Sequence, residues 1–159
     1  MKIAGKIIVG VLVGLFLVLL VVRATGLNPH GGVPGLWLSG NVVTTPETDW
    51  SWTDKYQTDE LQTNTWYGLP HSVTTWNIAY NGQLYLATSG ADVREWPKNV
   101  ARDPHVRLKI GDQLFDCTLV VVTDPAEIAG MMQVRAKKYH QPYPPPARQK
   151  FVVYHVVQS

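Results

Sequence analysis

The sequence predicts a mainly β (α+β) domain behind a single transmembrane helix. The domain is expected to be an antiparallel sheet of about six strands, curled into a closed or half-closed barrel, with one short and one longer helix. Three observations lead there: an uncharged apolar run at residues 7–22, several short alternating segments separated by Gly, Asn and Pro turns, and only two later segments with helix-start signals. Hairpin-linked strands with isolated helices are typical of small barrels.

The apolar run predicts an N-terminal membrane anchor. Its 16 residues span roughly 24 Å as a helix, and counting from Ile3 brings the run close to the thickness of a bilayer core. Lys2 and Lys6 precede the run and Arg23 follows it, which favours a single-pass protein with its N-terminus inside and its domain on the extracytoplasmic (periplasmic) side. A cleaved signal peptide is the alternative, although Arg23 falls inside the cleavage pattern at residues 22–24.

The chain divides into three parts on composition. Residues 1–26 form the anchor, residues 27–43 a linker with an added arm, and residues 44–159 the globular domain. The Gly- and Pro-rich residues 26–35 predict a linker that lifts the domain off the membrane. Trp50 and Trp52 lie in an irregular segment and are expected to pack in the core or a loop rather than in the membrane interface.

Alternation of apolar and polar residues predicts the strands. We expect them at residues 60–66, 72–80, 83–88, 106–110, 113–122 and 151–157. The segment 72–80 places Trp76, Ile78 and Tyr80 on one face, and the Asn81-Gly82 pair that follows is a strong hairpin signal. Val106, Leu108 and Ile110 are expected to point inward.

Two helices are expected inside the domain. The short one covers residues 97–102, with Pro97 at its first position and a stop before Asp103-Pro104. The longer one starts with Asp124 as its N-cap and Glu127 as a capping-box partner, and it ends near Tyr139. Arg135, Lys137 and Lys138 suit the negative C-terminal end of that helix.

Charge and cysteine content exclude several classes of protein. Without Lys2, Lys6 and Arg23, the 14 basic residues fall to 11 against 12 acids, which argues against a nucleic-acid-binding protein. The single cysteine, Cys117, allows no internal disulfide and is expected to be an inert, packed thiol. The five histidines are scattered, so the sequence predicts no metal site.

The order of motifs in residues 61–139 resembles a known family. A Trp-containing strand, an Asn-Gly hairpin and a strand ending in Ala-Thr are followed by W-x-x-N at Trp96–Asn99, by Asp-Pro before a strand, and by Thr-Asp-Pro before a helix. This order is similar to that of the split β-barrel flavin-binding proteins, both pyridoxamine-phosphate-oxidase-like and deazaflavin-dependent nitroreductase-like. The resemblance covers about half of the chain.

The resemblance implies FMN or a deazaflavin in a cleft at the interface of a homodimer. The protein would then be a membrane-tethered flavin- or deazaflavin-dependent oxidoreductase, nitroreductase- or quinone-reductase-like, with hydride or electron transfer carried out by the cofactor. No catalytic side chain and no substrate is assigned. The implied cofactor-binding residues are Thr74, Thr75 and Trp76 at the ring, Thr88, Ser89, Trp96 and Asn99 near the ribityl-phosphate side, and Arg94 and Lys98 at the phosphate.

One departure from the family pattern keeps an alternative open. Relatives that bind phosphate carry Arg or Lys just before the second strand, whereas residues 67–72 here have no permanent positive charge. His71 could contribute only when protonated. The alternative is a non-catalytic split-barrel binding module that has lost the cofactor, or one that binds another flat ligand such as haem or a quinone.

Overall fold

The computed structural model of this protein describes residues 2–147 and 149–159. Its elements are α1 (Lys2–Thr25), β1 (Asn41–Val42), the 3-10 helix η1 (Trp50–Lys55), β2 (Asp59–Thr63), β3 (His71–Thr75), β4 (Asn77–Tyr80), β5 (Gln83–Ser89), α2 (Glu95–Arg102), β6 (His105–Ile110), β7 (Gln113–Val121), α3 (Pro125–Lys138) and β8 (Phe151–Gln158).

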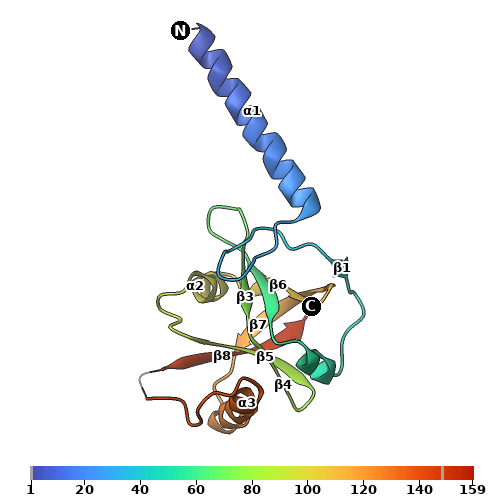
Figure 1. The fold of residues 1–159 in the computed structure, drawn as a ribbon, viewed down its shortest axis with the longest axis vertical. Coiled ribbons are helices and arrows are strands. Elements are labelled where there is room, and N and C mark those ends of the chain that lie inside the picture. The colour runs from blue at the N-terminus through green and yellow to red at the C-terminus, as the bar shows by residue number, and fades with distance from the viewer. Residues whose placement is uncertain (1, 148) are drawn as a thin grey trace.

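The strands form one curled antiparallel sheet, as the sequence predicts. Their order is β3-β2-β6-β7-β8-β5-β4, and the two-residue β1 is added in parallel beside β7. Figure 1 shows the sheet bent on itself, with α3 against one side and α1 extending away from the domain. The predicted half-closed barrel with one short and one longer helix is therefore confirmed.

The predicted single strand at residues 72–80 is wrong. It is two strands, because β3 pairs with β2 while β4 pairs with β5, and Trp76 alone lies between them. β3 and β4 are therefore consecutive in the chain yet occupy the two ends of the sheet. The alternation predicts one strand because it continues through Trp76, but the hydrogen-bonding partner changes there.

The hairpin that follows is confirmed. Tyr80 pairs with Gln83, and Asn81 and Gly82 both have positive φ angles, 52° and 74°. Two-residue turns with both φ values positive match the right-handed twist of the strands they join. β2, by contrast, ends at Thr63 rather than at residue 66.

Two apolar clusters hold the sheet together. The larger fills the barrel with the inward side chains of the strands, including Val106, Leu108 and Ile110 as predicted, and is covered by Trp50 of η1. The smaller lies between the sheet and α3 and is centred on Met131. Trp50 and Trp52 pack in or against the larger cluster, which confirms the expectation for both.

The helix ends differ from prediction in two details. α2 begins at Glu95 instead of Pro97, and Pro97 is accepted because it stays within the first turn, where backbone N–H groups have no intrahelical partner. Asp124 caps α3 as predicted, accepting a hydrogen bond from the N–H of Ala126 at 3.1 Å. Glu127 does not close a capping box; its carboxylate accepts a hydrogen bond of 2.6 Å from the Tyr85 hydroxyl.

The segment that follows α1, for which the composition predicts a linker, is folded against the barrel. It folds back on itself, with the N–H of Leu27 donating to the carbonyl of Trp37 and that of Leu36 to the carbonyl of Leu27, at 2.7 and 2.8 Å. Gly35 then exchanges two backbone hydrogen bonds with Ser72 of β3, at 2.9 and 3.1 Å. The junction between α1 and the barrel is therefore a folded part of the domain.

α1 is solvent-exposed along its length and is long and apolar enough to cross a membrane. An N-terminal signal sequence can have the same length and composition. This helix is therefore compatible with both predictions, an uncleaved membrane anchor and a cleaved signal peptide.

Gly35→Ala tests the folded junction. A Cβ at Gly35 would lie 2.1 Å from the Leu27 carbonyl oxygen, so the two segments must separate. We expect the free energy of unfolding to fall by about 1 to 3 kcal/mol, as for other overpacked sites. The measurement is chemical unfolding of the full chain in detergent. Gly32→Ala is the control, because a Cβ there meets nothing within 4 Å; equal stability of the two variants would contradict the prediction.

Candidate functional site

A cavity of about 340 Å³ opens where β3 and β5 end and α3 crosses the sheet. Seven of the nine residues predicted for cofactor binding line it: Thr74, Thr75, Trp76, Thr88, Ser89, Arg94 and Trp96. The remaining lining residues are Ala87, Arg135, Gln141, Gln149 and Phe151. The described lining thus combines aromatic rings, small hydroxyl and amide side chains, and two arginines.

Sheet topology brings these residues together. Thr74 and Thr75 are the last residues of β3, which lies at one end of the sheet. Thr88 and Ser89 end β5, which lies next to β4 at the other end and pairs with the start of β8. The cavity therefore lies at the seam of the half-barrel, where the chain passes from one end of the sheet to the other.

Trp76 forms an aromatic wall at this seam. Its ring stacks on that of Tyr139 with centroids 4.4 Å apart and planes 10° apart. Its side chain remains 38% exposed, so the ring has surface left for a further contact. A flat ligand can lie against such a ring by offset stacking.

Arg135 is the buried cation of the cavity lining. Its guanidinium carbon lies 5.3 Å from the centre of the Trp76 ring and 4.6 Å from that of Phe151, and the residue is only 8% exposed. Burial lowers the pKa of this guanidinium, and the nearby Tyr139 opposes that effect. Among residues 2–147 and 149–159, no carboxylate lies within ion-pair distance of it. A buried arginine that faces a cavity without a carboxylate partner is suited to bind an anion.

Arg94 stands at the rim of the cavity. It is the residue before the first turn of α2, and its Nε donates a hydrogen bond of 3.0 Å to the carbonyl oxygen of Ser89. That bond ties the start of α2 to the end of β5. Arg94 is otherwise exposed, so part of its guanidinium faces solvent.

Lys98 and Asn99, the other two predicted residues, lie outside the cavity lining. Lys98 is exposed and pairs with Glu95 at 3.2 Å. Asn99 is buried, donates to the Thr63 hydroxyl at 3.0 Å and accepts from Arg102 at 3.0 Å. The amide of Asn99 therefore braces α2 against β2.

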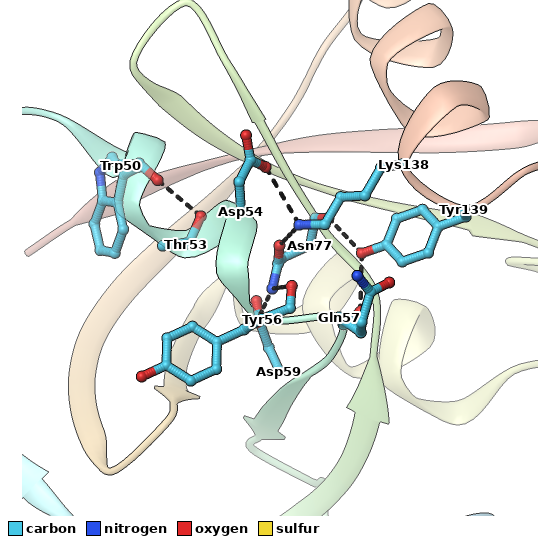
Figure 2. A network of polar contacts seen from close by, with 9 residues as sticks. All are labelled: Trp50, Thr53, Asp54, Tyr56, Gln57, Asp59, Asn77, Lys138 and Tyr139. Carbon is cyan, nitrogen blue, oxygen red and sulfur yellow. Dashed lines mark hydrogen bonds and ion pairs between the residues drawn. The ribbon is translucent and has the colours of Figure 1, made fainter.

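A polar network surrounds Asn77 and reaches Tyr139, the residue on which Trp76 stacks (Figure 2). Asn77 donates a hydrogen bond to the carboxylate of Asp59 and accepts one from the ammonium of Lys138. The Tyr139 hydroxyl lies 2.6 Å from the carbonyl oxygen of Asn77 and 2.9 Å from that of Gln57. The network fixes the ring of Tyr139, and Tyr139 in turn positions Trp76.

Two acidic groups near the site have raised pKa values. Burial raises the pKa of Asp59 to about 7, against the opposing effects of Asn77 and Lys138. Its second oxygen, Oδ2, is buried without a hydrogen-bond partner among the described residues. Burial, followed by the nearby Asp59 carboxylate, raises the pKa of the Tyr139 hydroxyl.

Cys117 is buried in the core away from the cavity, and burial raises the pKa of its thiol to about 12, as expected for an inert thiol.

Five lining residues are not predicted from the sequence: Ala87, Arg135, Gln141, Gln149 and Phe151. From its position, Arg135 is expected only as one of several charges at a helix end. A signal was nevertheless present, because Arg135 is spaced four residues after Met131 and four before Tyr139, and residues with this spacing lie on one face of a helix. Met131 is buried, so that spacing also places Arg135 toward the sheet.

Comparison with known proteins supports the fold. No protein-family model matches the chain, and no curated protein matches its sequence. Among solved structures, a protein from Bacteroides thetaiotaomicron assigned as a 5-nitroimidazole antibiotic resistance protein has a TM-score of 0.56 and 14% identity, covering 82% of this chain and 90% of its own.

Two further solved structures have the same architecture. A protein from Listeria innocua assigned as a pyridoxamine 5'-phosphate oxidase has a TM-score of 0.53 and 18% identity, with 67% of this chain and 87% of its own covered. An F420 reductase has a TM-score of 0.51 and 20% identity, with 72% and 96% covered. At these identities the similarity establishes a shared split-barrel fold.

The raised pKa of Asp59 predicts a specific pH dependence of stability. The folded state holds the proton more tightly than the unfolded chain, so the contribution of this group is complete below about pH 4 and is lost as the pH rises through about 7. Between pH 4 and pH 8, the free energy of unfolding of the wild type should therefore fall relative to that of Asp59→Asn, by on the order of 4 kcal/mol.

Unfolding of both proteins in detergent at several pH values measures this difference. Asp49→Asn is the contrasting variant, because hydrogen bonds from Ser51 lower the pKa of Asp49 and its contribution is lost as the pH falls. Its effect should have the opposite sign. A wild-type minus Asp59→Asn difference that does not change with pH would refute the assignment of a buried, titrating Asp59.

Proposed function

We propose that this chain is a membrane-tethered split-barrel oxidoreductase that binds a flavin or deazaflavin in the cavity at the seam. The observation that supports it most directly is the convergence of Thr74, Thr75, Trp76, Thr88, Ser89, Arg94 and Trp96 on one cavity. Those residues come from three separate stretches of the sequence, and the family resemblance implies all of them. The nitroreductase- or quinone-reductase-like reaction class follows from the same resemblance.

The chemistry of the lining fits such a cofactor. A flavin has a flat ring system and, in its phosphorylated forms, a strongly anionic end. Trp76 and Phe151 offer aromatic surface to the ring, and the guanidinium held between them offers positive charge. The cavity volume of about 340 Å³ is near the lower end of the range for ligand pockets, which suits a site that a second copy of the chain completes.

Each group of residues has a distinct role in this proposal. Trp76 lies against the ring, and the hydroxyls of Thr74, Thr75, Thr88 and Ser89 donate or accept hydrogen bonds along its polar edge and side chain. Arg135 holds an anionic group inside the cavity and Arg94 holds the exposed end at the rim. The bound cofactor supplies hydride or electron transfer, and the protein orients it and limits access of water.

The tether and the dimer belong to the same proposal. α1 anchors the chain with its N-terminus inside and the barrel on the extracytoplasmic side, in line with the placement of Lys2, Lys6 and Arg23 around the apolar run. A homodimer places the cavity at an interface, and the half-exposed ring of Trp76 is available to a partner as well as to a ligand.

A non-catalytic binding module is the second candidate. One observation favours it: the lining within residues 2–147 and 149–159 contains no Asp, Glu, His, Cys, Lys or Tyr, so none of these lining side chains is a general acid or base. The same lining contains no His, Cys, Met or Tyr to serve as an axial ligand for haem iron. A flat anionic ligand other than haem remains the better match for this module.

Cofactor titration of the full chain in detergent tests the proposal. FMN and reduced deazaflavin are expected to bind at micromolar concentrations, with quenched flavin fluorescence because the ring stacks on Trp76. Turnover of a nitroaromatic or quinone by the reduced complex separates the enzyme from the binding module. Absence of binding of both cofactors at tens of micromolar would rule out the flavin-binding function.

Arg135→Gln tests the anion-binding role. If Arg135 holds the phosphate, its loss removes a charge-assisted hydrogen bond of about 1.5 to 3 kcal/mol, so FMN affinity should fall at least about tenfold. Riboflavin, which lacks the phosphate, should bind wild type and variant alike. Lys137→Gln is the matched control, since it removes one positive charge two residues away on an exposed part of α3. Equal losses of FMN and riboflavin affinity would assign Arg135 to the ring instead.

A further inference from the structure

The turn between β2 and β3 presents an exposed aromatic pair. Trp66 is 79% exposed and Tyr67 is 54% exposed, and their rings meet edge to face with centroids 5.4 Å apart. Residues 65–70 contain no charged side chain. Two large apolar side chains left in water without charged neighbours in sequence indicate a contact surface.

This turn has a defined shape. The Thr65 hydroxyl donates a hydrogen bond to the carbonyl of Leu69, and the N–H of Gly68 donates to the carbonyl of Thr65 at 3.4 Å. A guanidinium of α2 also holds its base, because Arg102 donates to the carbonyl of Asn64 at 2.9 Å. The aromatic pair therefore projects from a fixed support.

α1 leaves the barrel at the same end as this turn. Arg23 in the last turn of α1 lines an open hollow of about 390 Å³ together with Asn64 of the β2–β3 turn and His105 at the start of β6. Figure 1 shows the β2–β3 turn, drawn in green, reaching the level at which α1 ends. The folded segment after α1 holds this arrangement, since Gly35 is hydrogen-bonded to Ser72 only a few residues beyond the turn.

We propose that the β2–β3 turn inserts Trp66 and Tyr67 into the headgroup region of the bilayer that α1 crosses, so that the barrel rests on the membrane in one orientation. The inference rests on the tether of the proposed function and is independent of the cofactor. Trp and Tyr favour the membrane–water interface because their rings are apolar while their N–H or O–H groups still reach water.

The charges around the turn suit the same partner. Arg23 and Arg102 flank the turn, one from α1 and the other from α2, and both are exposed. Asp103 also lies at the base of the turn, where it accepts a hydrogen bond of 2.8 Å from the Asn64 amide. Lipid phosphates at the surface of a bilayer attract arginines at this level. An aromatic pair can lie within the headgroup layer while the neighbouring guanidinium groups bind lipid phosphates.

Fluorescence quenching in liposomes tests the contact. The full chain, carrying Trp66→Cys or Tyr67→Cys labelled with an environment-sensitive dye, is reconstituted with lipids that hold a spin label near the headgroup. Cys117 is buried with a raised thiol pKa, so the label reports on the introduced cysteine. Ala126→Cys is the control, because Ala126 is exposed in the first turn of α3 and Figure 1 shows α3 at the end of the domain away from α1.

We expect the dye at positions 66 and 67 to lose most of its fluorescence to the spin label while the dye at position 126 keeps its own. If one of the two variants folds poorly, the other label position still tests the contact. If the protein floats with the liposomes but the dye is not quenched at position 66 or 67, the membrane contact of the turn is overturned while the tether stands. A chain that does not float with liposomes would overturn the tether and this contact together, whereas cofactor binding is measured separately. If the fluorescence of the dye at position 66 changes with protein concentration and not with the spin-labelled lipid, the surface contacts a second copy of the chain instead of the membrane.

Discussion

The change of partner at Trp76 is the constraint on which the structure depends. Within one residue the chain leaves the β2 edge and joins β5, so β3 and β4 close the two ends of a curled sheet. The next residue, Asn77, belongs to a buried polar network: Asn77 binds Asp59 and Lys138, and the Tyr139 hydroxyl binds the carbonyl oxygen of Asn77. Buried polar groups are costly unless paired, so this network specifies one arrangement of the seam.

Most of the fold follows from local sequence patterns. The Asn81-Gly82 turn, the alternation of Val106, Leu108 and Ile110, and the Asp124 cap each determine structure within a few residues. The misassigned features depend on distant partners. The break at Trp76 requires knowledge of which strand pairs on each side, and the folded segment around Gly35 depends on hydrogen bonds to Ser72, which a composition rich in Gly and Pro does not reveal.

The candidate site was predictable to the extent that its residues lie at strand ends. Thr74, Thr75, Thr88 and Ser89 could be placed from the order of motifs, because the ends of β3 and β5 lie on either side of the seam. Arg135 could not be assigned from charge alone, since basic residues are common in the last turns of helices. For Asn99, motif position and structural placement differ: its position fits the family pattern, whereas its amide is hydrogen-bonded to Thr63 and Arg102.

The placement of the cavity relative to α1 bears on the kind of substrate. β3 begins at His71, near the turn beside α1, and ends at Thr75, which lines the cavity, so the length of the strand separates the two. In the proposed orientation, with the β2–β3 turn at the bilayer, the end of β3 that lines the cavity is the end farther from the membrane. A quinone dissolved in the membrane would have to leave the lipid to reach Trp76, whereas a water-soluble acceptor would not. The proposed orientation therefore fits a water-soluble acceptor better than a quinone dissolved in the membrane as the substrate of the proposed oxidoreductase.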